Sequence, residues 1–281
     1  MPYNIIMKKK YIPIIIIPVI VALLFFACAT NPLTGQRHMA LVSNAELFPA
    51  SFAQYNEILE QSKIITGTPE AEMVKRVGLR LTEAAEKWYA SIGESNYLAD
   101  YRWEYNLIEE NTVNAWCMPG GKIAFYTGIL PYTQNEAGLA VVMGHEICHA
   151  LLNHGQQRVS ADTVQQGGAL AATVAMQIFG VPEGIQSMGM LGYQLGSTYL
   201  GTMPFGRNHE SEADRFGLTL MAIAGYDPDE APVFWQRMSA SGGASIPQWM
   251  STHPSDETRV RQLQGWVPEA KAKAAEFGIN F

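Results

Sequence analysis

Apolar residues recur at helical spacing early in the chain, directly after a cap signal. Thr68 precedes Pro69, and this pair is typical of the first turn of a helix. Hydrophobic positions then return every three or four residues, at Met73, Val74, Val77, Leu81, Ala84, Ala85 and Trp88. The pattern predicts an amphipathic helix that ends near Gly93.

Between Trp103 and Thr127 the pattern changes to short runs rich in Trp, Tyr, Val and Ile. Polar residues at 109–111 and Pro119-Gly-Gly at 119–121 interrupt these runs in the way turns do. We therefore expect a small antiparallel sheet in this region.

Three helices are expected after the sheet. The spacing of Thr133 and Glu136 predicts a capping box that opens the first, which should stop by Gly155 or shortly beyond. Residues 207–224 and 229–238 have helical periodicity as well, and Gly225 and Pro228 separate them. The chain is thus expected to be an α+β fold that is mostly helical.

One long segment of the chain is almost free of charge. Between residues 163 and 206 only Glu183 is charged, and the segment is rich in Ala, Gly and Met. Two buried helices that pack through small residues are the favoured interpretation. A surface that dips into a membrane or contacts apolar substrate is the alternative.

The N-terminus has the layout of a secretory signal. Three lysines at 8–10 precede an uncharged run from Tyr11 to Phe26, and Ala27, Cys28 and Ala29 follow. The run is shorter than the roughly 20 residues that span a bilayer. A small residue before a cysteine resembles the bacterial lipobox, which would make Cys28 the lipid-modified N-terminus.

Phe25 and Phe26 depart from the usual lipobox residues, so an uncleaved inner-membrane signal anchor remains the alternative. Either arrangement puts the domain outside the cytoplasm. In an oxidising compartment Cys117 and Cys148 could form a disulfide, although two buried thiols are favoured.

The charge balance argues against a nucleic-acid partner. The formal net charge is −7, and without the three N-terminal lysines 16 basic residues stand against 26 acidic ones. An acidic surface repels phosphate backbones, so nucleic acid is not expected as a partner.

His145-Glu-Ile-Cys-His149 is the motif with the most specific chemistry. Histidines four apart on a helix share a face and can bind one metal ion, while Glu146 stays free to act as a general base. Zinc is the metal that such a site prefers, with three protein ligands and one open position. We expect one Zn²⁺ per chain.

A third ligand must come from elsewhere in the chain. His154 is five residues beyond His149, which puts it well around the helix from the two histidines. Glu210 and Asp214 share a face of a later helix, so Glu210 can bind the metal while Asp214 accepts the outer N–H of a ligating histidine. Glu212 should point the opposite way.

These motifs together resemble the gluzincin metallopeptidases of the LoiP and BepA type, which are related to HtpX and to the mitochondrial overlapping-activity protease. The resemblance rests on five segments in the right order: 28–35 (CATNPLTG), 114–128 (NAWCMPGGKIAFYTG), 145–149 (HEICH), 210–214 (ESEAD) and 251–255 (STHPS). It covers nearly the whole chain after residue 27.

The resemblance implies a zincin-like fold with the active-site helix beneath the small sheet. It also implies a zinc endopeptidase on the periplasmic face of the outer membrane that hydrolyses damaged or misassembled cell-envelope proteins. The expected layout is a lipoprotein signal peptide at 1–27, a lipid-anchored tether at 28–60 and a catalytic domain at 61–281. No C-terminal helical repeats are expected.

Further site residues follow from the same resemblance. The strand formed by Lys122, Ile123, Ala124, Phe125 and Tyr126 would border the cleft and pair with an extended substrate. His253 would approach the metal, either as an inhibitory fourth ligand or as a catalytic aid, and Arg259 would lie near it. Cys148 stands where relatives often have a small residue.

A rival interpretation is a non-catalytic, zinc-bearing envelope lipoprotein that binds or chaperones partners. Glu146 argues against it, because a site that only holds zinc has no use for a carboxylate that ligates nothing.

Overall fold

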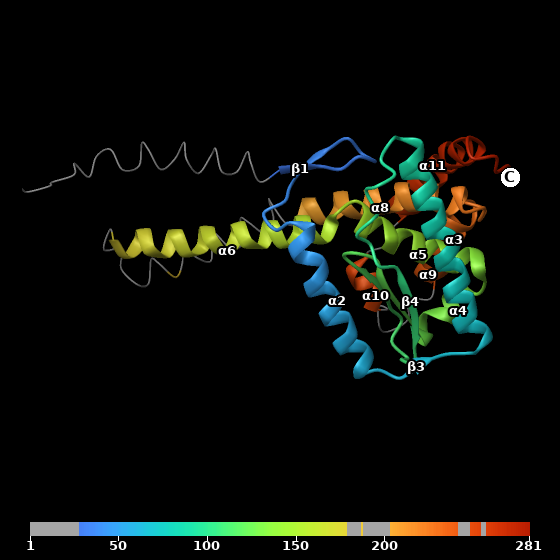
Figure 1. The fold of residues 1–281 in the computed structure, drawn as a ribbon, viewed down its shortest axis with the longest axis horizontal. Helices are drawn as coiled ribbons and strands as arrows, with labels where there is room; N and C mark the ends of the chain where they lie inside the picture. The colour runs from blue at the N-terminus through green and yellow to red at the C-terminus, as the bar shows by residue number, and fades with distance from the viewer. Residues whose placement is uncertain (1–27, 179–186, 188–202, 241–247, 254–256) are drawn as a thin grey trace, which may run out of the picture.

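The computed structural model describes residues 28–178, 187, 203–240, 248–253 and 257–281. Helices surround a small sheet, and the mostly helical α+β class is confirmed (Figure 1). The helices are α2 (Asn44–Glu60), α3 (Pro69–Ser91), α4 (Leu130–Thr133), α5 (Glu136–Leu151), α6 (His154–Ile178), α8 (Met203–Ile223), α9 (Glu230–Ala240), α10 (Gln248–Thr252) and α11 (Glu257–Ala275). The strands are β1 (Cys28–Thr30), β2 (Arg37–Met39), β3 (Ile64–Ile65), β4 (Glu104–Ile108), β5 (Ala115–Met118) and β6 (Lys122–Tyr126), and a 3₁₀ turn, η1 (Thr127–Ile129), follows β6.

The main sheet is mixed, whereas an antiparallel sheet was expected. Its strand order is β3-β4-β6-β5, and β4 and β6 run parallel while the other neighbours are antiparallel. Gly120 and Gly121 have φ of 83° and 91°, values that glycine adopts without strain, and they close the β5–β6 hairpin. Because β5 occupies one edge of β6, β4 pairs with the other.

This strand order corrects the expected substrate strand. Lys122–Tyr126 is β6, which is hydrogen-bonded on both sides by β4 and β5, so its backbone is not available to a substrate. Ile123, Ala124 and Phe125 are fully buried in the core. The edge strands of this sheet are β3 and β5, and β5 is the one that lies against α5.

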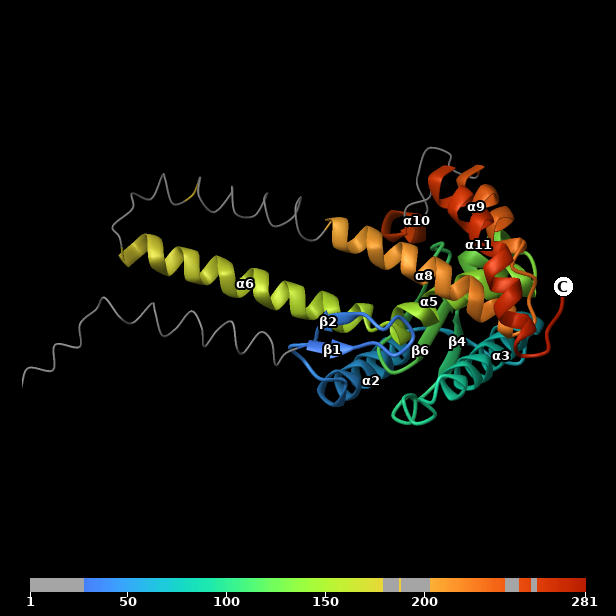
Figure 2. The ribbon, with the colours of Figure 1, turned by 90° about the horizontal axis from the view of Figure 1, so that it is seen from above.

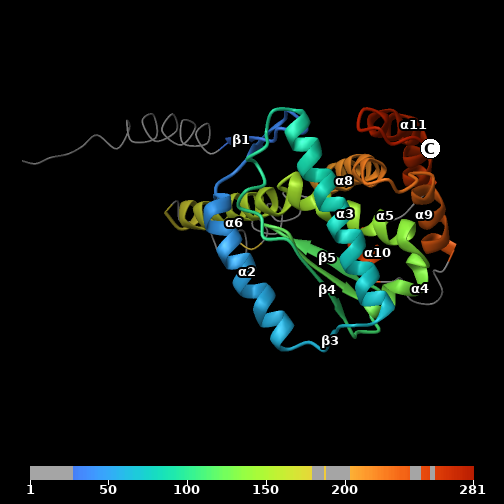
Figure 3. The ribbon, with the colours of Figure 1, turned by 45° about the vertical axis from the view of Figure 1, so that its right-hand side comes forward.

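Helix α5 lies at the centre of the fold, against β5, α3 and α8 (Figure 3). It begins at Asn135, whose side chain accepts a hydrogen bond from the Gly138 N–H, so Asn135 is the cap and not Thr133. Buried side chains satisfy its last carbonyls: Tyr101 donates to Ala150 O at 3.0 Å and Asn31 to Leu151 O at 2.8 Å. The helix is thereby held at both ends.

Residues 28–60 fold onto the rest of the molecule and do not form the expected tether. They contain the β1–β2 hairpin and α2, which begins with a capping box between Ser43 and Glu46. Tyr55 of α2 is fully buried and donates a hydrogen bond to Ile123 O at 2.9 Å. Residues 31–37 contain turn formers and no apolar period, which is typical of a tether, but contacts with the rest of the fold order the segment. The expected signal peptide at 1–27 lies outside the described residues.

Helix α6 extends away from the body of the molecule (Figure 2). Leu170 in its outer half is 67% exposed, so this part of the apolar segment is not the buried helix that was favoured. The second half of the segment falls largely outside the described residues. Among the described helices, none combines the length and the hydropathy needed to cross a membrane.

Candidate metal centre

Four potential ligands converge on one point above α5. His145 and His149 come from successive turns of α5, Glu210 comes from α8, and His253 follows α10. One donor atom from each lies within 4.8 Å of all the others. The His145 Nε2 to His149 Nε2 distance is 3.0 Å, and the Glu210 carboxylate oxygens lie 3.4 and 3.3 Å from these two nitrogens. The structure thus brings together all three expected ligands and His253.

The donor set fits zinc. Two imidazoles and one carboxylate, with Glu146 left out, are the ligands of many catalytic zinc sites. Burial alone would raise the pKa of Glu210, but hydrogen bonds from His145, His149 and His253 hold that pKa well below its usual range. Glu210 is therefore a carboxylate at neutral pH. An anion buried among imidazoles calls for a cation between them.

Asp214 and Arg259 hold the first of these histidines. His145 Nδ1 lies 2.9 Å from Asp214 Oδ1, and Arg259 donates to both oxygens of Asp214 at 2.6 and 2.7 Å. Burial would lower the pKa of His145, but hydrogen bonds to Asp214 and Glu210 outweigh it and raise that pKa to about 9. Burial would raise the pKa of Asp214, and the positive charge of Arg259 lowers it instead. Asp214 thus lies where sequence spacing placed it.

Glu146 lies beside the four donors and has two other partners. Trp249 Nε1 donates to Glu146 Oε1 at 2.8 Å, and His253 Nε2 is 3.4 Å from the same oxygen. Trp249 is fully buried, and its ring stacks on Trp235 at 4.9 Å between centroids. Arg259 in turn lies 3.5 Å above the Trp235 ring. The two tryptophans therefore link the Arg259–Asp214 pair to Glu146.

Sequence reasoning missed Trp249, although a signal for it existed. Trp249 lies in α10, and His253, four residues later, directly follows that helix. His253 N donates to Trp249 O at 2.9 Å, as in a helical turn. That spacing puts both side chains on one face of a helical turn. Trp249 N also donates to Val113 O at 3.0 Å, next to the start of β5. This contact anchors α10 against the sheet.

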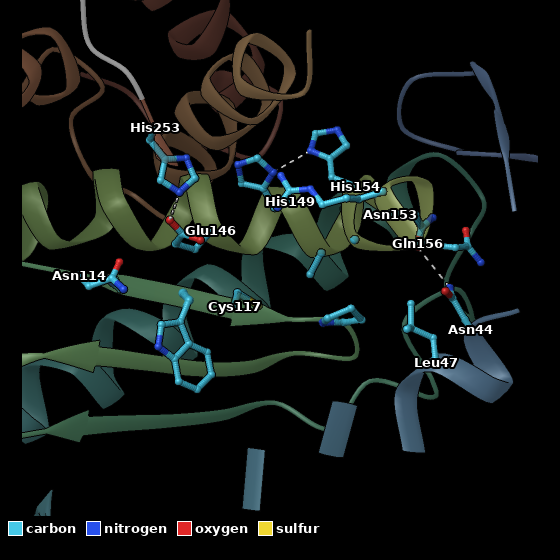
Figure 4. A pocket seen from close by; sticks show the side chains of 16 residues that line it. Asn44, Leu47, Asn114, Cys117, Glu146, His149, Asn153, His154, Gln156 and His253 are labelled. Carbon is cyan, nitrogen blue, oxygen red and sulfur yellow. Dashed lines mark hydrogen bonds and ion pairs between the residues drawn. The ribbon is translucent and has the colours of Figure 1, made fainter. Parts of the chain in front are cut away.

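A cavity of about 270 Å³ opens between α5 and the β5 edge. Figure 4 shows Glu146, His149 and His253 on its upper wall and Asn114 and Cys117 on the strand below. Cys117 and the buried Cys148 are free thiols, as favoured from the sequence. Burial raises the pKa of both thiols, so neither is reactive at neutral pH.

His154 and Glu212 lie close to the centre but outside its four donors. His154 Nδ1 is 2.9 Å from His149 Nδ1, on the side of that ring away from Glu210, and His154 Nε2 is 3.2 Å from Glu212 Oε2. His154 is thus not a ligand, as its spacing indicated. Glu212 is not a ligand either, but the contact with His154 was not anticipated.

This arrangement of helices, sheet and donors is that of a zinc metallopeptidase. The histidines and Glu146 come from one helix beneath a sheet edge, and the carboxylate ligand comes from a second helix. The sequence model of peptidase family M48 matches residues 79–267, which include every residue of the candidate metal centre. Since this match covers more than half of the chain, the chain belongs to peptidase family M48.

Curated relatives are similar to this chain over part of their own length. Mitochondrial metalloendopeptidase OMA1 of Schizosaccharomyces pombe is 35% identical over 178 residues, which are 63% of this chain and 50% of that protein. Mitochondrial OMA1 of Danio rerio is 30% identical over 265 residues, 89% of this chain and 53% of that protein. The beta-barrel assembly-enhancing protease of Escherichia coli is 31% identical over 183 residues, 62% of this chain and 36% of that protein. The chain spans about half of these relatives or less.

Proposed function

We propose that the protein is a zinc-dependent endopeptidase that hydrolyses damaged or misassembled proteins of the cell envelope. The observation that carries the proposal is the position of Glu146. It lies on the cavity wall next to the three ligands without belonging to the donor group. A site that only binds zinc would not need this carboxylate beside its ligands.

His145, His149 and Glu210 would hold the zinc. When bound, zinc supplies Lewis acidity, which polarises the scissile carbonyl and brings the pKa of water to about 7. Glu146 takes a proton from the attacking water and later passes it to the leaving amine. The indole N–H of Trp249 fixes one Glu146 oxygen and leaves the other free for this transfer. Arg259 acts through Asp214, because its guanidinium binds that carboxylate at both oxygens.

The substrate would bind along β5, the edge strand of the sheet that lies against α5. An extended peptide can add to an exposed strand through main-chain hydrogen bonds. Residues 114–117 line the cavity on the side facing Glu146. Strand addition uses the backbone N–H and C=O groups of the substrate. An unfolded polypeptide has these groups available, whereas a folded protein has most of them in its own hydrogen bonds. This supports unfolded or misassembled proteins as the substrate class.

His253 would act as an inhibitory fourth ligand in the resting enzyme. Its Nδ1 is 3.1 Å from His145 Nε2 and 2.6 Å from Glu210, within the donor group. Zinc with three protein ligands has one open position, and a fourth donor there competes with water. Substrate entry would therefore require His253 to move.

The envelope location rests on the N-terminus and on one relative. The uncharged run before Cys28 predicts export, and the resemblance of residues 27–28 to a lipobox implies lipid attachment at that cysteine. The periplasmic face of the outer membrane is what the family resemblance implies. The relative from Escherichia coli is described as a beta-barrel assembly-enhancing protease. An envelope protein that fails to assemble is thus a fitting substrate.

The test is to incubate purified zinc-loaded protein with one envelope β-barrel protein, in its unfolded and in its folded form. We expect cleavage of the unfolded form, protection of the folded form and loss of cleavage with a zinc chelator. Intact substrate in all reactions, with zinc bound, would favour the non-catalytic binding module instead.

Fractionation of cells tests the location separately. We expect wild-type protein in the membrane fraction with its N-terminus at Cys28, and Cys28→Ser in the soluble fraction or unprocessed. A membrane-bound protein with an intact N-terminus by mass spectrometry would support the signal anchor.

A further inference from the structure

The second metal-binding histidine has a buried partner of its own. His154 is the first residue of α6 and is 2% exposed, and its Nδ1 faces His149 Nδ1 at 2.9 Å. Figure 4 draws this contact between the two rings. On its other side His154 Nε2 lies 3.2 Å from the Glu212 carboxylate. Glu212, His154 and His149 thus form a continuous chain that ends at the metal centre.

The protons in this chain can be assigned from chemistry alone. When His149 Nε2 binds a metal, its Nδ1 carries the ring proton and must donate it. The carboxylate of Glu212 can only accept, so the Nε2 of His154 carries a proton as well. His154 Nδ1 then keeps its lone pair and accepts from His149. Every contact has one donor and one acceptor, and His154 is neutral.

A break between two helices makes this contact. On a continuous helix, a residue five positions beyond His149 would lie about 140° around the axis. Helix α5 ends at Leu151 instead, and Asn153 has φ of 58°, which turns the chain into α6. His154 is thereby brought back onto the outer edge of His149.

His154 is also held rigidly in its orientation. Its ring stacks on His209 at 4.0 Å between centroids, with an angle of 8° between the planes. His209 Nε2 is in turn 3.1 Å from Gln157 Oε1. A ring fixed by stacking on one side can set the orientation of the ring it bonds to.

We propose that His154 and Glu212 are positioning residues for the zinc ligand His149. They orient its ring and keep its proton on Nδ1, and so leave Nε2 free for zinc. Asp214 positions the other ligand, His145, by direct contact with its Nδ1, and Asp214 is itself paired with Arg259. The two histidines therefore have outer partners of different kinds, a carboxylate paired with arginine and a neutral imidazole backed by Glu212.

Zinc affinity tests this role without depending on any substrate. The full chain and its variants would be titrated with zinc against a chromogenic chelator, with unfolding of the zinc-free protein as the folding check. His154→Phe keeps a ring to stack on His209 but loses both nitrogens, and we expect zinc to bind roughly 10- to 100-fold more weakly. His154→Asn keeps an acceptor near the Nδ1 position and is expected to recover most of this loss.

Glu212→Ala serves as the second variant, because its side chain is 27% exposed and its removal should not prevent folding. We expect it to weaken zinc binding in the same direction. Glu269→Ala is the matched control, since it removes a carboxylate that pairs with Arg215 and leaves the chain from Glu212 to His149 in place. Its zinc affinity should equal that of the wild type.

The proposal is overturned if folded His154→Phe and Glu212→Ala bind zinc as tightly as the wild type. Equal losses in His154→Phe and His154→Asn would also contradict it, because they would indicate a packing role for the ring. A loss in His154→Phe and Glu212→Ala that His154→Asn reverses would support it.

Discussion

Backbone contact between α5 and α8 sets the distance between the histidines and Glu210, and Gly217→Ala should disturb it. A Cβ built on Gly217 would lie 2.9 Å from the His145 nitrogen and 3.0 Å from the Gly144 carbonyl carbon. Ordinary contacts begin at 3.4 Å. The two helices must therefore separate by about 0.5 Å, because neither obstacle is a side chain that can rotate away.

The size of this shift predicts two effects. Overpacking of this kind costs about 1–3 kcal/mol of unfolding free energy. In a chain of this size each kcal/mol corresponds to a fall in Tm of roughly 2–4 °C. Glu210 lies about two helical turns from Gly217 on α8. Metal–ligand distances tolerate only about 0.2 Å, so zinc affinity should fall along with stability.

Gly206→Ala on the same helix is the matched control. Among the residues that the structure describes, no atom lies within 4 Å of a Cβ at Gly206. Alanine there should leave zinc binding unchanged and leave stability equal or higher by roughly 0.5–1 kcal/mol. The assays are thermal unfolding of the zinc-free protein and zinc titration against a chelator. Gly217→Ala with wild-type values in both would refute the argument that this close approach sets the site.

The remaining predictions concern the site itself. Glu210→Ala should remove most bound zinc, as metal analysis of the purified variant will check, and full zinc content would exclude Glu210 as a ligand. Trp249→Phe keeps the stacked ring but removes the N–H that donates to Glu146. With zinc retained, kcat/KM should fall roughly 10- to 100-fold, which corresponds to the loss of a hydrogen bond to a charged group. An unchanged kcat/KM would show that this hydrogen bond does not contribute to catalysis. His253→Ala should retain zinc and cleave faster in steady-state assays, because a competitor for the open position is gone. Slower cleavage with full zinc would make His253 a catalytic aid, and unchanged rates would refute both roles.

The zinc ligands could be predicted because helical periodicity alone relates them. His145 and His149 are four residues apart, and so are Glu210 and Asp214, so each pair shares a face whatever the rest of the fold does. The structure brings these residues together with the expected partners. Likewise the helix that begins after Thr68 could be read from its cap and its apolar positions.

Strand order could not be read in this way. The short runs rich in Trp, Tyr, Val and Ile between Trp103 and Thr127 predicted a sheet, but such runs carry no information about which strand pairs with which. In the structure β4 pairs with β6, so β6 is an interior strand of the sheet. The contact between His154 and His149 was out of reach for a similar reason, since it depends on a left-handed residue, Asn153, that interrupts two helices.

The most direct test of the central claim is proteolysis by Glu146→Gln compared with the wild type at equal zinc content. The amide keeps the size of the side chain and can still bond to Trp249, but it cannot accept a proton from water. We predict that the variant binds zinc as the wild type does and fails to cleave an unfolded envelope protein. Substantial cleavage by zinc-loaded Glu146→Gln would contradict the assignment of Glu146 as the general base.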